Sequence, residues 1–121
     1  MKMSIYESGE DYLEQILMLL EKKGYARSID IAAGMKVSKP SVSVAMKKLR
    51  EDGYIIMGTD NLISLTEEGY AIARKIYNRH QALTKYLVQL GVPEKTARED
   101  ACRMEHDLSD DSFDAIRGQI V

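Results

Sequence analysis

The segment Ser38–Leu65 reads SKPSVSVAMKKLREDGYIIMGTDNLISL, and its periodicity changes near the middle. Ser38 is predicted to cap a helix, with Pro40 in its first turn. Apolar residues then recur at helical spacing: Val42, Ala45, Met46 and Leu49. Gly53 ends this pattern. The second half predicts two short strands, residues 54–57 and 62–65, joined by the turn-forming residues GTDN. The segment therefore predicts a helix followed directly by a β-hairpin.

Two patterns before this segment predict further helices. The first is expected to begin at Ser8, as its N-cap, and to end at Gly24. The second is SIDIAAGM, which Ser28 would cap and Gly34 would end. Two helices, a turn, a basic helix and a hairpin follow one another in the order of a winged helix-turn-helix.

The rest of the chain has only helical patterns. Helices are expected at residues 66–90, 93–108 and 110–120. The predicted fold class is mainly α, with a winged helix-turn-helix domain at residues 1–65 and an all-helical domain at residues 66–121.

Charge is distributed unevenly along the chain, whose formal net charge is −2. Between Lys22 and Arg50 there are eight basic residues and one acidic residue, whereas residues 91–121 hold four basic and eight acidic ones. A basic block in an acidic chain indicates a localised anionic partner, although a solvated helix face would look the same.

The third predicted helix carries polar and basic side chains away from its apolar stripe, so it can lie in the major groove of DNA. Its cations are expected to bind phosphates, and its serines can reach base edges or phosphates. The predicted DNA-binding residues are Arg27, Ser38, Lys39, Pro40, Ser41, Ser43, Lys47 and Lys48. The alternative is a winged helix that binds only protein.

Cys102, Glu105 and His106 stand at positions i, i+3 and i+4, which places all three on one face of the expected helix. Sulfur, oxygen and nitrogen donors in this arrangement suit a divalent transition metal. A surface Glu–His pair beside a small cysteine is the simpler reading of the same spacing. Asp11 and Glu14, which share a face of the first helix, carry further candidate donors, but spacing alone cannot show that the segments converge.

A nucleophilic enzyme is a third reading, since a thiolate and an imidazole can form a catalytic pair. The chain has no HExxH, Walker-type or GxGxxG motif and nothing that resembles a nucleophile elbow. We therefore expect that the protein is not an enzyme.

A cytoplasmic protein is expected from composition. Of 121 residues, 45% are hydrophobic and 30% are charged, which suits a globular protein. No apolar run approaches the roughly 18 residues that a membrane helix needs, and the first residues have no secretory-signal pattern. The single cysteine cannot form an internal disulfide, as is usual in a reducing compartment.

Four stretches carry a resemblance to a known family: EDYLEQI at residues 10–16, LREDGYI at 49–55, YNRHQAL at 77–83 and DACRMEHDLSDD at 100–111. On these stretches the chain resembles the metal-dependent repressors of the diphtheria toxin repressor and manganese repressor (DtxR/MntR) family, over nearly its full length. The resemblance implies a winged helix joined to a helical dimerisation domain, with regulatory metal held between them. It also implies a short form, without the SH3-like third domain of longer members.

The resemblance implies a set of six metal ligands: Asp11, Glu14, His80, Cys102, Glu105 and His106. Asp11 and Glu14 match the manganese-type branch, whereas Cys102 matches the iron-type branch. Because a thiolate gains little with Mn(II), Fe(II) is favoured, with Mn(II) next and Zn(II) or Co(II) able to bind in vitro. Val44 stands where the iron-type recognition helix has a glutamine, so an operator sequence cannot be carried over.

The function that the resemblance implies is a repressor that senses intracellular Fe(II) or Mn(II) and controls metal-homeostasis genes. Expected partners are double-stranded DNA with a palindromic operator, and a second copy of the chain, with no membrane. A short apolar stripe is the candidate dimer interface, unless it packs on the chain's own long helix: Leu108, Phe113, Ile116 and Ile120. The alternative function is a metal-independent winged-helix regulator or protein-interaction module.

Overall fold

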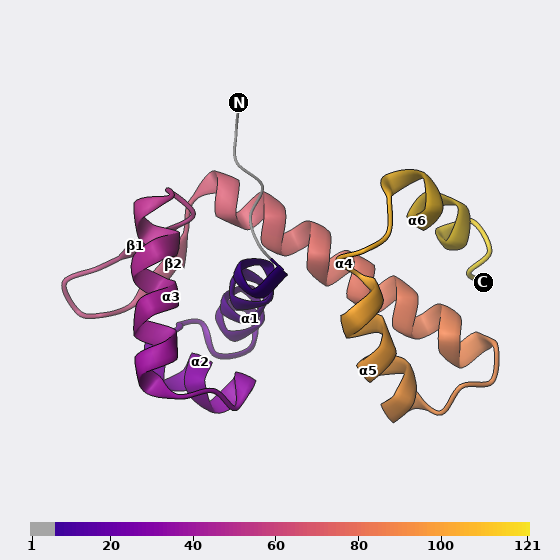
Figure 1. The fold of residues 1–121 in the computed structure, drawn as a ribbon, viewed down its shortest axis with the longest axis horizontal. Helices are drawn as coiled ribbons and strands as arrows, with labels where there is room; N and C mark the ends of the chain where they lie inside the picture. The colour runs from indigo at the N-terminus through magenta and orange to yellow at the C-terminus, as the bar shows by residue number, and fades with distance from the viewer. Residues whose placement is uncertain (1–6) are drawn as a thin grey trace. The chain divides into compact units, whose positions relative to one another are not determined.

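The computed structural model describes residues 7–121. Within these residues the chain forms helices and one hairpin in the order α1 Glu7–Lys23, α2 Ser28–Met35, α3 Lys39–Glu51, β1 Ile55–Met57, β2 Ile63–Leu65, α4 Glu67–Gln89, α5 Glu94–Met104 and α6 Asp110–Arg117 (Figure 1). The structure divides into a first unit that ends at Arg74 and a second unit, Lys75–Val121, with the division inside α4. The predicted mainly α fold, a winged helix-turn-helix followed by a helical domain, is confirmed.

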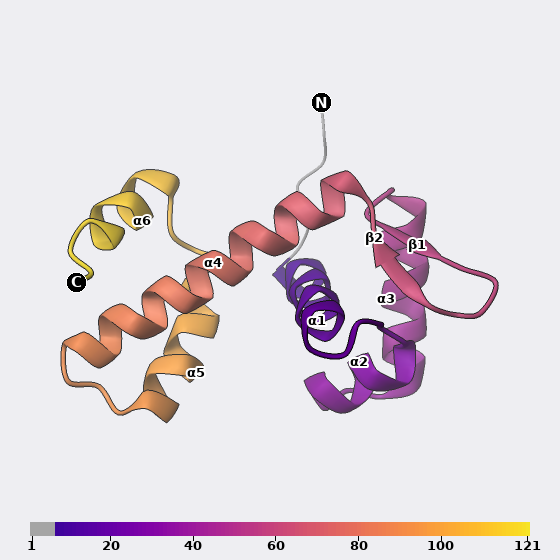
Figure 2. The same cartoon turned by 180° about the vertical axis from the view of Figure 1, so that it is seen from behind.

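The core of the first unit lies where α1, α3 and the hairpin meet. α1 contacts α2, α3 and β2, and α3 contacts β1. The largest fully buried apolar side chains of this unit come from α1, α2, α3 and β2: Leu13, Ile16, Ile31, Val42, Met46 and Ile63. The stretch between β1 and β2 extends away from the helices as the wing (Figure 2). Because the apolar face of α3 is buried in this core, the other face of the helix is left exposed.

The segment around α3 folds much as its sequence predicts. The Ser38 hydroxyl accepts a hydrogen bond of 3.2 Å from the Ser41 amide and so caps α3. Gly53, with φ of +83°, follows the end of the helix and adopts the left-handed conformation that glycine permits. The two strands pair antiparallel, with Ile56 opposite Ser64. Each strand begins one residue later than expected.

Three of the expected boundaries of α1 and α2 are wrong. Ser8 lies inside α1, so it is not the cap of that helix. Ser28 is the first helical residue of α2, whose cap position belongs to Arg27. Gly34 does not end α2, because the helix continues to Met35 and Lys36 takes the left-handed position beyond it. A Cβ atom at Gly34 would approach Nε2 of Gln15 on α1 to 2.3 Å, so a larger residue there would displace the end of that flexible side chain.

The second unit is built around a small apolar cluster. Leu83 of α4, Ala101 of α5 and Phe113 of α6 are buried together, and a further set packs against them: Ala82, Met104, Leu108 and Ile116. α5 ends at Met104, earlier than the predicted Leu108, so Glu105 and His106 lie in the turn that follows. Ser109 then caps α6 by accepting a 3.1 Å hydrogen bond from the Ser112 amide. Among the described residues, no helix has the length and apolar character needed to span a bilayer.

Candidate metal centre and DNA-binding surface

Glu105 is the centre of a polar cluster in the second unit. Its side chain is fully buried, and its Oε2 lies 3.1 Å from Nδ1 of His80, which α4 supplies. If the Nδ1–H of His80 donates to this carboxylate, the lone pair of Nε2 remains available to a cation, and the hydrogen bond fixes the ring. His80 and Glu105, two of the predicted ligands, therefore lie next to each other in this unit.

The second carboxylate oxygen of Glu105 faces His106. Nε2 of His106 lies 3.4 Å from Oε1 of Glu105, but Oε1 has no hydrogen-bond partner in the described structure. Burying a carboxylate oxygen without a hydrogen bond is unfavourable unless a cation compensates it. A buried carboxylate between two imidazoles is a donor set that Mn²⁺ and Fe²⁺ accept. These residues therefore fit the metal ion that the chain's resemblances imply.

Cys102 lies one turn before Glu105, on the last turn of α5. Its side chain is exposed, and its Sγ lies within 4.8 Å of a Glu105 carboxylate oxygen. Because Glu105 follows the last helical residue with α-type backbone angles, the expected i, i+3 relationship between thiol and carboxylate still holds. His106 lies beyond the helix, so the expectation that all three side chains project from one helix face is wrong for the imidazole.

Arg79 organises the turn that carries Glu105 and His106, and the sequence analysis did not select it. The side chain is buried, with 5% of its surface exposed, and its Nη1 donates to the backbone oxygens of Glu105 at 3.1 Å and Leu108 at 2.7 Å. Its Nη2 donates to the Asp110 carboxylate at 2.6 Å. The guanidinium also lies 5.0 Å from the ring centre of Phe113. An arginine directly before His80, on a helix that must face a core, was the available signal.

The Asp110 carboxylate faces two cations. Lys75 Nζ lies 3.2 Å away, in addition to Arg79. The hydrogen bond and positive charge of Lys75, followed by Arg79, hold the pKa of Asp110 below its ordinary value of 3.8. Since Asp110 is also the first residue of α6, its negative charge lies at the favourable end of the helix dipole.

The two remaining predicted ligands lie on α1. Asp11 and Glu14 are one turn apart, and Glu14 is buried whereas Asp11 is half-buried. They belong to the first unit, whereas the other four predicted ligands belong to the second. The predicted donors are therefore distributed over both units.

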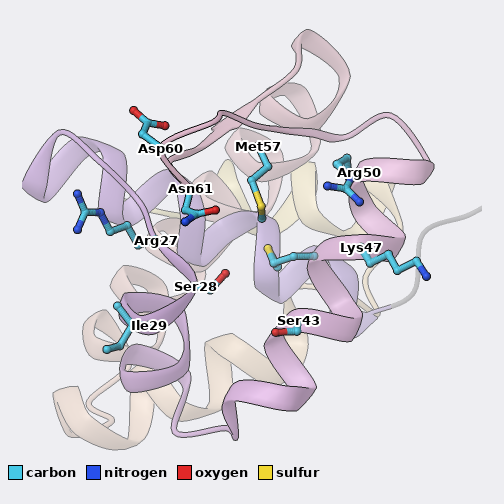
Figure 3. A pocket seen from close by; sticks show the side chains of 10 residues that line it. Arg27, Ser28, Ile29, Ser43, Lys47, Arg50, Met57, Asp60 and Asn61 are labelled. Atoms are coloured by element: carbon cyan, nitrogen blue, oxygen red, sulfur yellow. The ribbon is translucent and has the colours of Figure 1, made fainter.

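The predicted DNA-binding residues of the first unit are all exposed. The hydroxyl of Ser38, however, already accepts the hydrogen bond that caps α3. Between α2, α3 and the wing lies a hollow of about 570 Å³ (Figure 3). It is lined by Arg27, Ser28, Ile29, Ser43, Met46, Lys47, Arg50, Met57, Asp60 and Asn61. Three of these side chains are cations, so the hollow suits a phosphate group of the DNA backbone.

Arg50 and Asn61 are additions to the predicted DNA-binding surface. Arg50 belongs to the basic block, but its position in the last turn of α3 gave no reason to select it. Asn61 lies in the turn of the wing with φ of +64°, beside Asp60, whose carboxylate accepts a hydrogen bond from the Leu62 amide. Only the folding of the wing beside α3 brings these two residues to one hollow (Figure 3).

Three of the four residues predicted as a dimer interface pack within their own unit. Phe113 is buried against Leu83 and Ala101, and Leu108 and Ile116 pack on the same cluster. Packing on the chain's own long helix therefore accounts for much of this stripe. Contact of these residues with a second copy stays a prediction.

Two family models match the chain. The iron dependent repressor, N-terminal DNA binding domain, matches residues 4–62, and the iron dependent repressor, metal binding and dimerisation domain, matches residues 66–120. The HTH-type transcriptional regulator MntR of Bacillus subtilis (strain 168) is 41% identical over 114 residues, which are 94% of this chain and 80% of that protein. The transcriptional regulator MntR of Escherichia coli O157:H7 is 40% identical over 108 residues, 89% of this chain and 70% of that protein.

Solved structures agree with these matches. The manganese regulator SloR superposes with a TM-score of 0.81 and 28% identity, over 96% of this chain and 54% of that chain. A manganese-dependent transcriptional repressor in complex with manganese gives a TM-score of 0.83 and 27% identity, over 92% of this chain and 51% of that chain. The chain thus spans about half the length of these solved relatives. It belongs to the DtxR/MntR family of metal-dependent transcriptional repressors, with that family's DNA-binding domain followed by its metal-binding and dimerisation domain.

Proposed function

We propose that this protein represses metal-homeostasis genes in response to intracellular Fe(II) or Mn(II), by binding a palindromic operator as a homodimer. The observation that carries the proposal is the fully buried Glu105 carboxylate, held between His80 and His106 in the domain that matches a metal-binding model. A buried acid in this setting has a physical reason if it serves as a cation ligand.

The proposed ligands come from both units: Asp11 and Glu14 from α1, and His80, Cys102, Glu105 and His106 from the second unit. A bound divalent cation supplies the positive charge that these carboxylates, imidazoles and thiolate share. Without the cation, the carboxylates of Asp11 and Glu14 would repel the carboxylate of Glu105, because like charges repel. Ligation of both sets therefore couples the orientation of α3 to the dimerisation domain.

This coupling is a free energy shared between two ligands. Couplings of this kind amount to about 1–3 kcal/mol, and DNA must strengthen metal binding by the same factor by which metal strengthens DNA binding. The test is a metal titration with and without operator DNA. Equal metal affinities in the two titrations would contradict the proposed coupling and favour the metal-independent regulator.

Fe(II) is the metal that we favour, and Mn(II) is the second candidate. A thiolate at Cys102 adds more to the affinity for Fe(II) than for Mn(II), which lies lowest in the affinity order of the divalent series. The manganese regulators among the relatives support Mn(II). Zn(II) and Co(II) are expected to bind in vitro, but zinc usually takes four ligands and would leave part of a six-residue set unused.

The deciding experiment measures DNA binding across a metal series. Fluorescence anisotropy of a promoter fragment, under anaerobic conditions for Fe²⁺, should show tight binding with Fe²⁺ and Mn²⁺ and weak binding with chelator. Elemental analysis of the purified protein measures which ion it retains. Light scattering should give the mass of a dimer with metal present, and a monomer mass at micromolar concentration would contradict the dimer.

A further inference from the structure

Val44 is an apolar side chain on the outward face of α3, with 71% of its surface exposed. The residues that α3 turns into the core are Val42, Met46 and Leu49. At about 100° per residue, Val44 points nearly opposite to them. Because valine is a poorer helix former than most residues, neither the core nor the stability of α3 explains an exposed valine at this position.

The neighbours of Val44 on this face are polar or basic. Pro40 and Ser41 lie one turn before it, and Lys47 and Lys48 lie one turn after it, on its two sides. All four are exposed. Val44 is therefore the apolar centre of a face whose charges suit the phosphates of DNA.

The hollow beside α3 indicates which side of the helix meets a DNA strand. Lys47 and Arg50 of α3 and Arg27, which precedes α2, all line it (Figure 3). Lys48 lies on the other side of Val44. A helix of about 10–12 Å diameter fills a major groove of about 12 Å. With phosphates bound on both sides of α3, the residue midway between these cations faces the base edges.

Valine has no hydrogen-bonding atom, so it cannot read the donor and acceptor pattern of a base pair. The apolar group that a base presents in the major groove is the C5-methyl group of thymine. We infer that Val44 contacts a thymine methyl group in each half-site of the operator and so selects thymine over cytosine there. The inference rests on the proposed metal-dependent DNA binding and adds a specificity-determining residue to it.

The test begins with selection from a random-sequence duplex library, using the protein saturated with the metal ion that gives the tightest binding. Each thymine of the selected sequence is then replaced in turn by uracil, which pairs identically but lacks the methyl group. We expect one position per half-site at which uracil weakens binding about fourfold, the loss expected for one buried methyl group. In Val44→Ala, the affinities for the thymine and uracil duplexes at that position should become equal.

Lys47→Gln is the matched control, since Lys47 neighbours Val44 but is expected to bind phosphate. It should weaken binding to both duplexes while the fourfold thymine preference remains. Unchanged affinity after every uracil replacement would overturn the inference, and so would a uracil effect that persists in full in Val44→Ala. If no duplex is bound in a metal-dependent way, the proposed function fails and the inference fails with it.

Discussion

The guanidinium of Arg79 donates a 3.1 Å hydrogen bond to the backbone oxygen of Glu105, and so joins α4 to the turn that carries two proposed metal ligands. A second bond to the Leu108 oxygen and an ion pair with Asp110 fix the far end of the same turn. The turn is thus held by a buried cation before any metal binds. Arg79 is a positioning residue for Glu105 and His106.

Replacing Arg79 with methionine should therefore destabilise the metal-free protein and also weaken metal binding. Two backbone oxygens would lose their charged donor, which costs roughly 2 kcal/mol or more. Urea unfolding with chelator measures the first effect, and a metal titration measures the second. Arg79→Lys should restore part of both, since a lysine can still donate to one oxygen.

Arg117→Met is the control for this variant. Arg117 also lies near the Phe113 ring, at 5.8 Å from its centre, but 64% of its side chain is exposed. Its replacement should change the free energy of unfolding by no more than about 0.5 kcal/mol. Equal losses in the two variants would show that Arg79 acts only through the ring of Phe113.

Glu105→Gln should move stability and metal affinity in opposite directions. Glutamine has nearly the same shape, but it removes a buried negative charge, so the metal-free protein should be as stable as the parent or more stable. Metal affinity should fall at least about tenfold, because a charged ligand is lost. Thermal unfolding with and without Mn²⁺ measures both, since an ion at 100 times its Kd stabilises the parent by about 2.7 kcal/mol.

The control for that experiment is Glu99→Gln, an exposed glutamate of α5, the helix that ends just before Glu105. It should keep the full stabilisation by Mn²⁺. A Glu105→Gln protein that is stabilised by Mn²⁺ as much as the parent would remove Glu105 from the ligand set.

The ion pairs of Asp110 predict a pH dependence. Lys75 first, and then Arg79, lower the pKa of Asp110 in the folded state, so its stabilising contribution is present above the unfolded value and disappears as pH falls through the folded pKa. Asp110→Asn should therefore destabilise the protein near neutral pH but have little effect well below pH 3.8, the ordinary value. The difference in unfolding free energy between variant and parent, measured against pH, checks this.

Asp111→Asn serves as the reference, because Asp111 shares the first turn of α6. It should lose only the interaction with the helix dipole, which salt screens. A pH dependence of equal size in both variants would mean that the helix end, and not the pair of cations, determines the contribution of Asp110.

The hollow between α3 and the wing predicts two phosphate contacts. Lys47→Gln and Arg50→Gln should each weaken binding to all DNA sequences similarly and reduce the salt slope of log K by about one. Lys95→Gln, in α5 of the other unit, should leave the slope unchanged. An Arg50→Gln protein with the parent's slope would exclude Arg50 from the DNA-binding surface.

Some features of this fold can be predicted from the sequence, and others cannot. The order of helices and the hairpin follow from local periodicity, and Ser38 caps α3 as expected, because both depend on residues close together in the chain. The capping role given to Ser28 failed, since Arg27 takes the cap position before α2. Short patterns do not decide between neighbouring positions when tertiary packing sets where a helix begins.

The same distinction applies to the candidate metal centre and to the DNA-binding surface. His80 and Glu105 could be paired through their resemblance to a known family, whereas the role of Arg79 depends on backbone oxygens that no sequence pattern reports. Likewise, Arg50 belongs to α3 and Asn61 to the turn between β1 and β2. They line the same hollow only because the wing folds beside α3. Contacts of this kind require the folded chain.

The choice of metal depends most on Cys102. If its thiolate is a ligand, Cys102→Ser should lower the affinity for Fe²⁺ and Co²⁺ more than that for Mn²⁺, and Cys102→Glu should shift the DNA-binding response toward Mn²⁺. The absorption band of a cobalt–thiolate bond should be present in the parent and absent from Cys102→Ser. Thr96→Ala, an exposed substitution on the same helix, should keep both the band and the metal order. A Cys102→Ala protein with unchanged metal affinity and unchanged preference would show that sulfur does not bind the ion, and the protein would then be expected to respond to manganese.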